Sequence, residues 1–110
     1  MNIINGIDLV NLTRNEFNDP AFAKRIMVQQ EYDHYLELVD QAKVKYVAST
    51  FACKEAVMKA FKLTYGYKQI YIKKTEHCRL VYLKGIYQDN LTLSISYADQ
   101  FVIASLVGFN

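Results

Sequence analysis

Residues 41–62 read QAKVKYVASTFACKEAVMKAFK and decide the fold. No Gly or Pro interrupts this run, and the good helix formers Ala and Lys recur through it. We therefore expect one long central helix here. One stripe of this helix, at steps of three and four residues, consists of Val44, Ala48, Phe51, Glu55 and Met58. A carboxylate is thus predicted to lie among apolar side chains.

The segments before this helix predict one strand and two shorter helices. The pair Asp19-Pro20 is typical of a helix start, with Asp as the cap and Pro in the first turn, and predicts a helix over about 20–27. A second short helix is expected over 29–38. The opening segment Ile3 to Val10 is short and rich in β-branched residues, which favours a strand in which Gly6 permits a close backbone approach.

The segments after the central helix change to the period of strands. Residues 69–74 and 79–83 are rich in β-branched and aromatic residues. Residues 91–97 alternate apolar and polar side chains, and a turn then leads into 101–107. The order predicts an α+β fold with an N-terminal strand, two to three helices including one long central helix, and then an antiparallel sheet.

The length of 110 residues, at 12.8 kDa, predicts one domain over 1–110. Because 52% of the residues are hydrophobic, extensive disorder is excluded. A chain of this size has little interior to spare for a deep pocket of its own. A site at a subunit boundary is therefore expected.

Charge and cysteine content narrow the partners and the compartment. The net charge of +2 is too small to predict binding to nucleic acid or to an anionic membrane, although the second half carries +4 and favours small anions. Cys53 and Cys78 form no C-x-x-C pair, and the polar first residues do not resemble a signal peptide. The longest uncharged run, Gln100 to Asn110, is too short to span a membrane. We expect a cytoplasmic protein without nucleic-acid or membrane partners.

Two acids break the apolar pattern on the faces that are expected to point inward. Ile4, Gly6, Asp8 and Val10 share one face of the opening strand, so Asp8 and Glu55 are predicted to point inward from different elements. Burying an ionised carboxylate without a partner costs several kcal/mol of folding free energy, as an order of magnitude.

Two interpretations of these acids are open. In the first, Glu55 pairs with Lys59 on the helix surface and Asp8 reaches solvent at the end of its strand. In the second, Asp8 and Glu55 bind one Mg²⁺, which commonly takes one or two carboxylates together with water and phosphate oxygens. Lys59 would then point a positive charge at that phosphate.

The same residues resemble a known two-part signature. Gly6-Ile7-Asp8, 42 intervening residues, and then the segment FACKEAVMKA at 51–60 resemble the motifs of the 4'-phosphopantetheinyl transferases, G-[IV]-D and [FW]-x-x-K-E-[SA]-x-x-K. Further matches to the small bacterial holo-acyl-carrier-protein synthases are Arg14, the segment 22–27 with Glu31, and the segment 93–96. The resemblance therefore covers nearly the whole chain, in the right order.

This resemblance implies a reaction. Enzymes of the family transfer the 4'-phosphopantetheine arm of coenzyme A to a serine of an apo acyl carrier protein and release adenosine 3',5'-bisphosphate. This step serves fatty acid biosynthesis and lipid metabolism. Asp8 and Glu55 match the family's magnesium ligands. Glu55 and Lys59 match its catalytic residues, Glu55 toward the serine proton and Lys59 on the pyrophosphate. The role of Lys54, the neighbour of Glu55, stays open between a structural or solvated lysine and a ligand contact.

The resemblance also implies partners. The family assembles as a homotrimer with coenzyme A between neighbouring subunits, and Arg14, Phe22 and Arg25 match its docking surface for the acidic carrier protein. The alternative for this surface is a capped helix with Phe22 in the core and two solvated arginines.

The chain departs from the family at the nucleotide end of coenzyme A. The family usually has Arg, His and Thr where this chain has Thr50, Tyr97 and Ala98. Coenzyme A contacts are expected from Lys59, Lys62, Thr50, Ser96 and Tyr97, although Thr does not reproduce the bidentate fork of Arg. The alternative function is a non-catalytic relative that binds a carrier protein or nucleotide without turnover.

Overall fold

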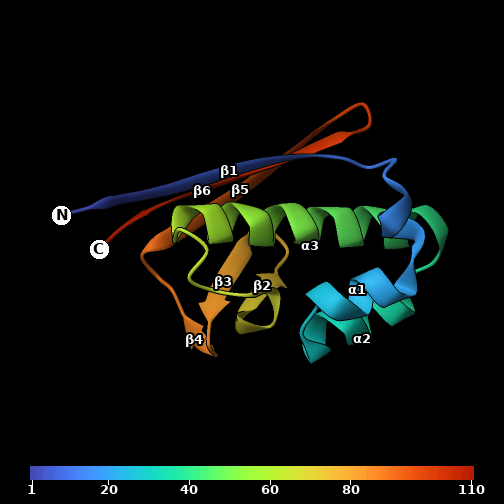
Figure 1. Cartoon of the computed structure of the whole chain (residues 1–110), viewed down its shortest axis with the longest axis horizontal. Helices are drawn as coiled ribbons and strands as arrows, with labels where there is room; N and C mark the ends of the chain where they lie inside the picture. The colour runs from blue at the N-terminus through green and yellow to red at the C-terminus, as the bar shows by residue number, and fades with distance from the viewer.

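The computed structural model describes residues 1–110 and contains three α-helices and a six-stranded antiparallel sheet (Figure 1). The predicted α+β class is confirmed. The helices are η1 (Asn15–Asn18), α1 (Pro20–Ile26), α2 (Gln29–Glu37), α3 (Asp40–Ala60) and η2 (Tyr67–Gln69), of which η1 and η2 are short 3₁₀ helices. The strands are β1 (Ile3–Asn11), β2 (Ile70–Lys74), β3 (Arg79–Leu83), β4 (Ile86–Tyr87), β5 (Leu91–Ala98) and β6 (Phe101–Phe109).

The central helix α3 is covered on almost all sides. Between Val47 and Val57 every residue is buried except Glu55. Strands β1 and β6 lie along one side of α3, while α1, α2 and β2 approach it from others (Figure 1). The helix ends at Ala60, two residues earlier than predicted, because Lys62 and Leu63 adopt left-handed backbone angles. Glu55 is therefore the one residue between Val47 and Val57 whose side chain is partly exposed.

The sheet has the strand order β1-β6-β5-β3-β2, and β4 pairs with β3 at one edge. Strands β1 and β6 pair along their whole length, so the two chain ends lie side by side (Figure 1). Strands β5 and β3 pair only between Leu93 and Arg79. The long strands β1, β6 and β5 thus form one wall beside α3, and β2 with β3 forms a second wall.

Strand β1 has the predicted alternation. Ile4, Gly6, Asp8 and Val10 face α3, while the residues between them are exposed. The expected close approach at Gly6 is also present, because a Cβ atom built there would lie 2.0 Å from the carbonyl oxygen of Ala56. The absence of a side chain at Gly6 brings β1 close enough to α3 for Asp8 to reach the helix.

Gly6→Ala is therefore expected to lower the free energy of unfolding by about 1–3 kcal/mol, because backbone atoms of α3 occupy the space that the new methyl group needs. Chemical denaturation of the variant tests this, with Gly66→Ala as the control because nothing lies within 4 Å of a Cβ at that position. Equal losses in the two variants would contradict a tight contact at Gly6.

The short elements agree only partly with the sequence predictions. The Asp19 side chain accepts a hydrogen bond from the backbone N–H of Ala21, which confirms the predicted cap of α1. The two-residue strand β4 and the helices η1 and η2 were not predicted. Helix η2 matters for function because it places Tyr67 beside α3.

Candidate active site

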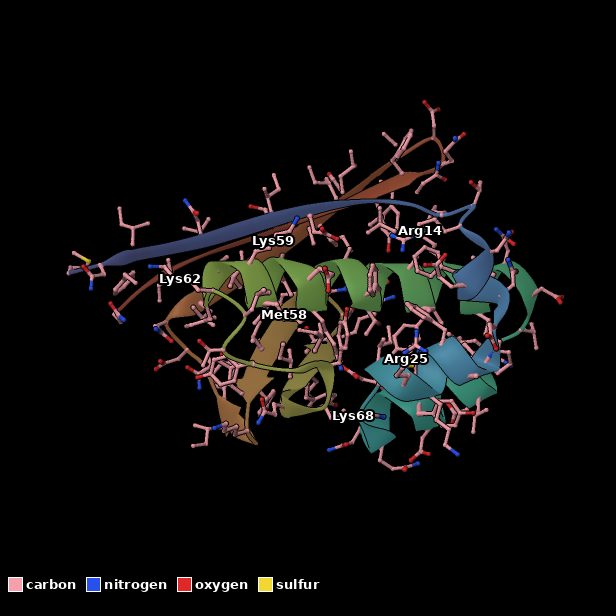
Figure 2. The ribbon with its side chains drawn as sticks, viewed as in Figure 1. Arg14, Arg25, Met58, Lys59, Lys62 and Lys68 are labelled. Carbon is pink, nitrogen blue, oxygen red and sulfur yellow. The ribbon has the colours of Figure 1, made fainter.

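Asp8 of β1 and Lys59 of α3 form an ion pair. The Lys59 Nζ lies 2.8 Å from the Asp8 Oδ1 and also donates to the backbone oxygen of Ile7 at 3.1 Å. Figure 2 shows Lys59 rising from α3 toward β1. The Asp8 side chain is only 11% exposed. The first interpretation of the two acids is thus wrong, because Lys59 pairs with Asp8 rather than with Glu55, and Asp8 is largely buried instead of reaching into solvent.

Glu55 makes its hydrogen bond to a residue that lies in the loop after α3. The hydroxyl of Tyr67 donates to the Glu55 Oε2 at 2.6 Å. Burial raises the pKa of Tyr67 to about 12, with further contributions from the hydrogen bond to Glu55, the negative charge of Glu55 and, more weakly, that of Asp8. The phenol therefore stays protonated at neutral pH, and the carboxylates of both acids lie within electrostatic reach of it.

Lys54 is a buried structural residue, which settles the question that the sequence left open. It forms an ion pair with Glu31 at 2.6 Å, and both side chains are fully buried. Its Nζ also donates to the backbone oxygens of Ile26 at 2.7 Å and Tyr67 at 3.0 Å. Burial lowers the pKa of Lys54, while the charge of Glu31 opposes this effect. Lys54 thus ties α1, α2 and η2 to α3.

Glu31 completes this buried network. Its Oε1 accepts the backbone N–H of Val28 at 2.9 Å, and its Oε2 accepts the backbone N–H of Ile72 in β2 at 2.8 Å. No buried side-chain polar atom in the chain lacks a hydrogen-bond partner. The network therefore satisfies the charges that it buries.

The chemistry of the donor set fits Mg²⁺. Asp8 and Glu55 offer carboxylate oxygens, the ligands that this hard cation prefers, from strand β1 and helix α3. No three His, Cys, Asp or Glu side chains come together anywhere in the chain. A magnesium ion at this pair would therefore need water and substrate oxygens to complete its coordination.

Lys62 and Lys68, two lysines that follow α3, differ in whether their ammonium groups are already bound within the chain. Lys62 is exposed just past the end of α3, beyond Lys59 (Figure 2). Lys68 is engaged, because its Nζ donates to the backbone oxygens of Lys24 and Met27 at the end of α1. Lys62 is thus available to a ligand, whereas Lys68 stabilises the fold.

The three residues of the expected docking surface lie together, although one of them is buried. The Arg14 guanidinium lies 5.2 Å from the ring centroid of Phe51, and that of Arg25 lies 5.2 Å from the ring centroid of Phe22. Both arginines are exposed, but Phe22 is only 7% exposed and packs on Phe51. Phe22 therefore lies in the core beneath Arg25.

The residues expected at the nucleotide end of coenzyme A do not join Asp8 and Glu55 within one chain. Thr50 is only 5% exposed, whereas Ser96 and Tyr97 are exposed near the end of β5. The Lys45 Nζ lies 4.3 Å from the ring centroid of Tyr97. Lys45 precedes Glu55 by ten residues, which is about 15 Å along a helix.

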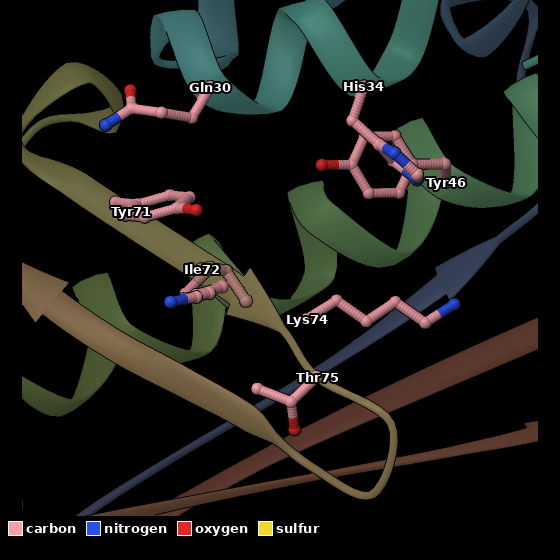
Figure 3. Close-up of a pocket in the computed structure, with 8 residues that line it drawn as sticks. Gln30, His34, Tyr46, Tyr71, Ile72, Lys74 and Thr75 are labelled. Carbon is pink, nitrogen blue, oxygen red and sulfur yellow. The ribbon is translucent and has the colours of Figure 1, made fainter. Parts of the chain in front are cut away.

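A cavity of about 420 Å³ lies away from the predicted site, between α2, α3 and β2 (Figure 3). His34 packs edge-on against Tyr46 at its rim, with ring centroids 4.8 Å apart. None of the predicted site residues lines it.

None of the helices combines the length and the apolar character that crossing a membrane requires.

Comparison with known proteins identifies the family. The sequence model of the 4'-phosphopantetheinyl transferase superfamily matches residues 5–105, a range that contains Asp8, Glu55 and Lys59. The chain belongs to this superfamily. The resemblance noted in the sequence is thereby confirmed.

Relatives within this transferase superfamily share both sequence and fold with the chain. It is 50% identical over 109 residues to a holo-[acyl-carrier-protein] synthase of Ureaplasma parvum, covering 98% of this chain and 95% of the relative. Among solved structures, a holo-(acyl-carrier-protein) synthase of Bacillus anthracis in complex with coenzyme A (3',5'-ADP) is 26% identical, with a TM-score of 0.77 and coverage of 96% of this chain and 94% of that one. The Helicobacter pylori synthase in complex with coenzyme A is 25% identical, with a TM-score of 0.74 and coverage of 96% and 100%.

Tyr67 is the one residue of this site that no sequence motif indicated. It lies in a loop that follows neither a helical nor a strand period, so only the structure places its hydroxyl on Glu55. Glu31 was among the matched residues, but its pairing with Lys54 across 23 positions has no signal in a single sequence.

Proposed function

We propose that the chain is a holo-acyl-carrier-protein synthase, which transfers the 4'-phosphopantetheine arm of coenzyme A to a serine of an apo acyl carrier protein. The observation that carries this proposal is the Asp8–Lys59 ion pair, which joins β1 to α3 one helical turn beyond Glu55, inside the segment matched by the transferase family. The 50% identity to a curated synthase over 98% of the chain supports it. Cytosol is the proposed location.

Asp8 and Glu55 are the proposed ligands of one Mg²⁺. When bound, this ion supplies Lewis-acid stabilisation of the negative charge that develops on the pyrophosphate of coenzyme A. Lys59, which pairs with Asp8 and whose side chain is about half exposed, is the proposed partner of a pyrophosphate oxygen. Lys62, exposed one turn further on, adds a second positive charge for the same substrate.

Glu55 is the proposed acceptor of the serine proton. The serine Oγ forms a bond to the phosphorus that carries the pantetheine arm, and the bond from that phosphorus to the bridging oxygen breaks. The proton of the serine hydroxyl passes to Glu55, directly or through water, and adenosine 3',5'-bisphosphate leaves. Atoms and charge balance without a further reactant.

The carrier protein is proposed to dock on Arg14 and Arg25. Both are exposed and cationic, which suits an acidic partner and would speed its encounter with the enzyme. Phe22 supports Arg25 from beneath, through the cation–π contact at 5.2 Å.

Reversing the charge of Arg14 or Arg25 to Glu is expected to raise the KM for apo carrier protein about tenfold and to leave the KM for coenzyme A unchanged, because these residues steer only the protein substrate. Steady-state kinetics at low and high salt measure this effect. Lys73→Glu, on the exposed part of β2, is the control. An unchanged KM for the carrier in both arginine variants would place docking elsewhere.

A homotrimer with coenzyme A between subunits is the proposed assembly. The outer face of β1 and β6 is mainly apolar, and its exposed large apolar residues are Ile3, Ile7, Leu9, Phe101, Val107 and Phe109. Because contiguous apolar faces of this kind are typical of subunit contacts, a second copy of the chain is the occupant that we infer. Such packing would let Ser96 and Tyr97 of one subunit approach Asp8 and Glu55 of another.

Leu9→Lys is expected to dissociate the trimer, because the new charge lies on the apolar face, where Leu9 is 62% exposed in one chain. Sedimentation equilibrium should give three chains for the wild type and one for the variant. Mixing the inactive variants Glu55→Gln and Tyr97→Ala should restore some transfer if one site uses both residues from different subunits. A monomeric wild type with full activity would rule out the shared site.

Transfer itself is tested by mass spectrometry. The chain is incubated with coenzyme A, Mg²⁺ and several apo carrier proteins, beside a known synthase as a positive control. We expect the mass of one phosphopantetheine arm to be added to the carrier. If no carrier is modified while the control enzyme works, the chain is a non-catalytic relative, the alternative that Thr50, Tyr97 and Ala98 motivate.

A further inference from the structure

We propose that Tyr67 is a positioning residue for Glu55, whose hydroxyl fixes the orientation of this carboxylate for the cation. The inference rests on the proposed function and deepens it. Tyr67 donates to the Glu55 Oε2 at 2.6 Å, a short, charge-assisted hydrogen bond. This is the only hydrogen bond that Glu55 makes through its side chain, and Glu55 forms no ion pair. The Oε1 atom is therefore the oxygen left free for another ligand.

The position of the Tyr67 hydroxyl is set by contacts other than Glu55. Its backbone oxygen accepts a hydrogen bond from the Lys54 Nζ at 3.0 Å. Its ring stacks on Phe51, with centroids 6.1 Å apart and planes 30° from parallel. Lys54 is in turn fixed by its buried pair with Glu31. The phenol therefore meets Glu55 from a rigid support, as a positioning group must.

The three contacts that Tyr67 makes with α3 explain why its side chain is held rigidly. Phe51 lies about one turn before the neighbouring residues Lys54 and Glu55 on α3, and all three contact Tyr67. One loop residue is thus held at its ring, backbone and hydroxyl by a single helix. Rotation of the Glu55 side chain would break its hydrogen bond with the Tyr67 hydroxyl but would leave the Phe51 and Lys54 contacts in place. The hydroxyl therefore stays in position and favours one orientation of the carboxylate.

A hydrogen bond to a metal-binding carboxylate affects the metal as well as the fold. Groups that orient such ligands typically contribute about 10–100-fold to metal affinity or activity. A purely structural hydroxyl would affect unfolding alone. Metal affinity in the absence of substrate therefore separates the two roles.

The experiment compares Tyr67→Phe with Tyr65→Phe. Each variant loses one phenolic oxygen and keeps its ring. Tyr65 packs edge-on against Phe61 at 5.4 Å, and no hydrogen bond involves its hydroxyl, so it is a matched control in the same loop. Mn²⁺, which can be followed by electron paramagnetic resonance, serves as the probe, and thermal unfolding verifies that both variants are folded.

Tyr67→Phe is expected to weaken Mn²⁺ binding about tenfold or more and to lower kcat while the KM for coenzyme A stays within about twofold. Tyr65→Phe should change none of these. Mn²⁺ affinity within twofold of the wild type in Tyr67→Phe would overturn the proposal, whatever happens to kcat.

Two further measurements keep the outcomes distinct. If the wild type binds Mn²⁺ but transfers no arm, the proposed function fails while the metal comparison still tests Tyr67. If Tyr67→Phe is unfolded, the single variant Phe51→Leu, which weakens the support of the Tyr67 ring, replaces it. Phe51→Leu should also lower Mn²⁺ affinity, and unchanged affinity there would overturn the proposal.

Discussion

Glu55→Gln is expected to reduce the rate of phosphopantetheine transfer by about 1,000-fold or more. The amide has the shape of the carboxylate and its oxygen still accepts the Tyr67 hydroxyl, so the fold and the loop after α3 should be kept. It carries no negative charge for a cation and cannot take up the serine proton. Loss of a metal ligand and loss of a general base each contribute factors of about 10²–10⁴ or more.

The transfer rate is measured under conditions saturating in both substrates, with circular dichroism to verify the fold. Glu37→Gln is the matched control, because the Glu37 side chain is 78% exposed on α2 and lies outside the site. A Glu55→Gln variant that keeps more than a tenth of the wild-type rate would show that Glu55 is neither the base nor a metal ligand.

Lys54→Met is expected to have the largest effect on stability, lowering the free energy of unfolding by about 3–5 kcal/mol. Methionine fills most of the space of the lysine stem but leaves the Glu31 carboxylate buried without its cation. The backbone oxygens of Ile26 and Tyr67 also lose their donor. Removing one partner of a buried pair costs more than the pair itself contributes, because the remaining charge stays desolvated.

Chemical denaturation measures this loss, and two comparisons test its cause. Lys24→Met, on the exposed side of α1, should change stability by at most about 0.5 kcal/mol. The double variant Lys54→Met with Glu31→Met should recover part of the loss, since no uncompensated charge remains. If the double variant lost more free energy of unfolding than the two single variants lose together, the account of the Lys54–Glu31 pair would be contradicted.

Much of the fold was predictable because its signals are local. The uninterrupted run over 41–62 predicts α3, the Asp19-Pro20 pair predicts the start of α1, and the alternation over 91–97 predicts β5. The two-residue strand β4 has too few residues to show a period. Helix η2 depends on contacts with α3, which no local pattern contains.

The candidate site was predictable in its members but not in its contacts. Two acids on inward faces and the spacing of the motifs indicated Asp8, Glu55 and Lys59. The helical spacing suggested a pair between Glu55 and Lys59, but Gly6 lets β1 approach so closely that Asp8 takes Lys59 instead. The contact between β1 and α3 therefore outweighs a helix-surface pair between residues i and i+4, which contributes only about 0.5 kcal/mol.

Burial was the least predictable property of individual residues. The sequence left Lys54 open between a structural or solvated lysine and a ligand contact. It left Phe22 open between the docking surface and the core, and it matched Thr50 to a coenzyme A contact. Lys54 and Thr50 are buried because neighbouring elements, among them α2, β2 and η1, cover α3, and Phe22 of α1 is buried because it packs on Phe51. A helix surrounded on nearly all sides has no polar stripe from which such positions could be assigned.

The central claim is that Asp8 and Glu55 bind one divalent cation, and a Mn²⁺ titration tests it most directly. Electron paramagnetic resonance of the wild type with coenzyme A should show one bound Mn²⁺ per chain, lost in both Asp8→Ala and Glu55→Gln while thermal unfolding remains cooperative. Undiminished binding of one Mn²⁺ per chain in both folded variants would contradict the account.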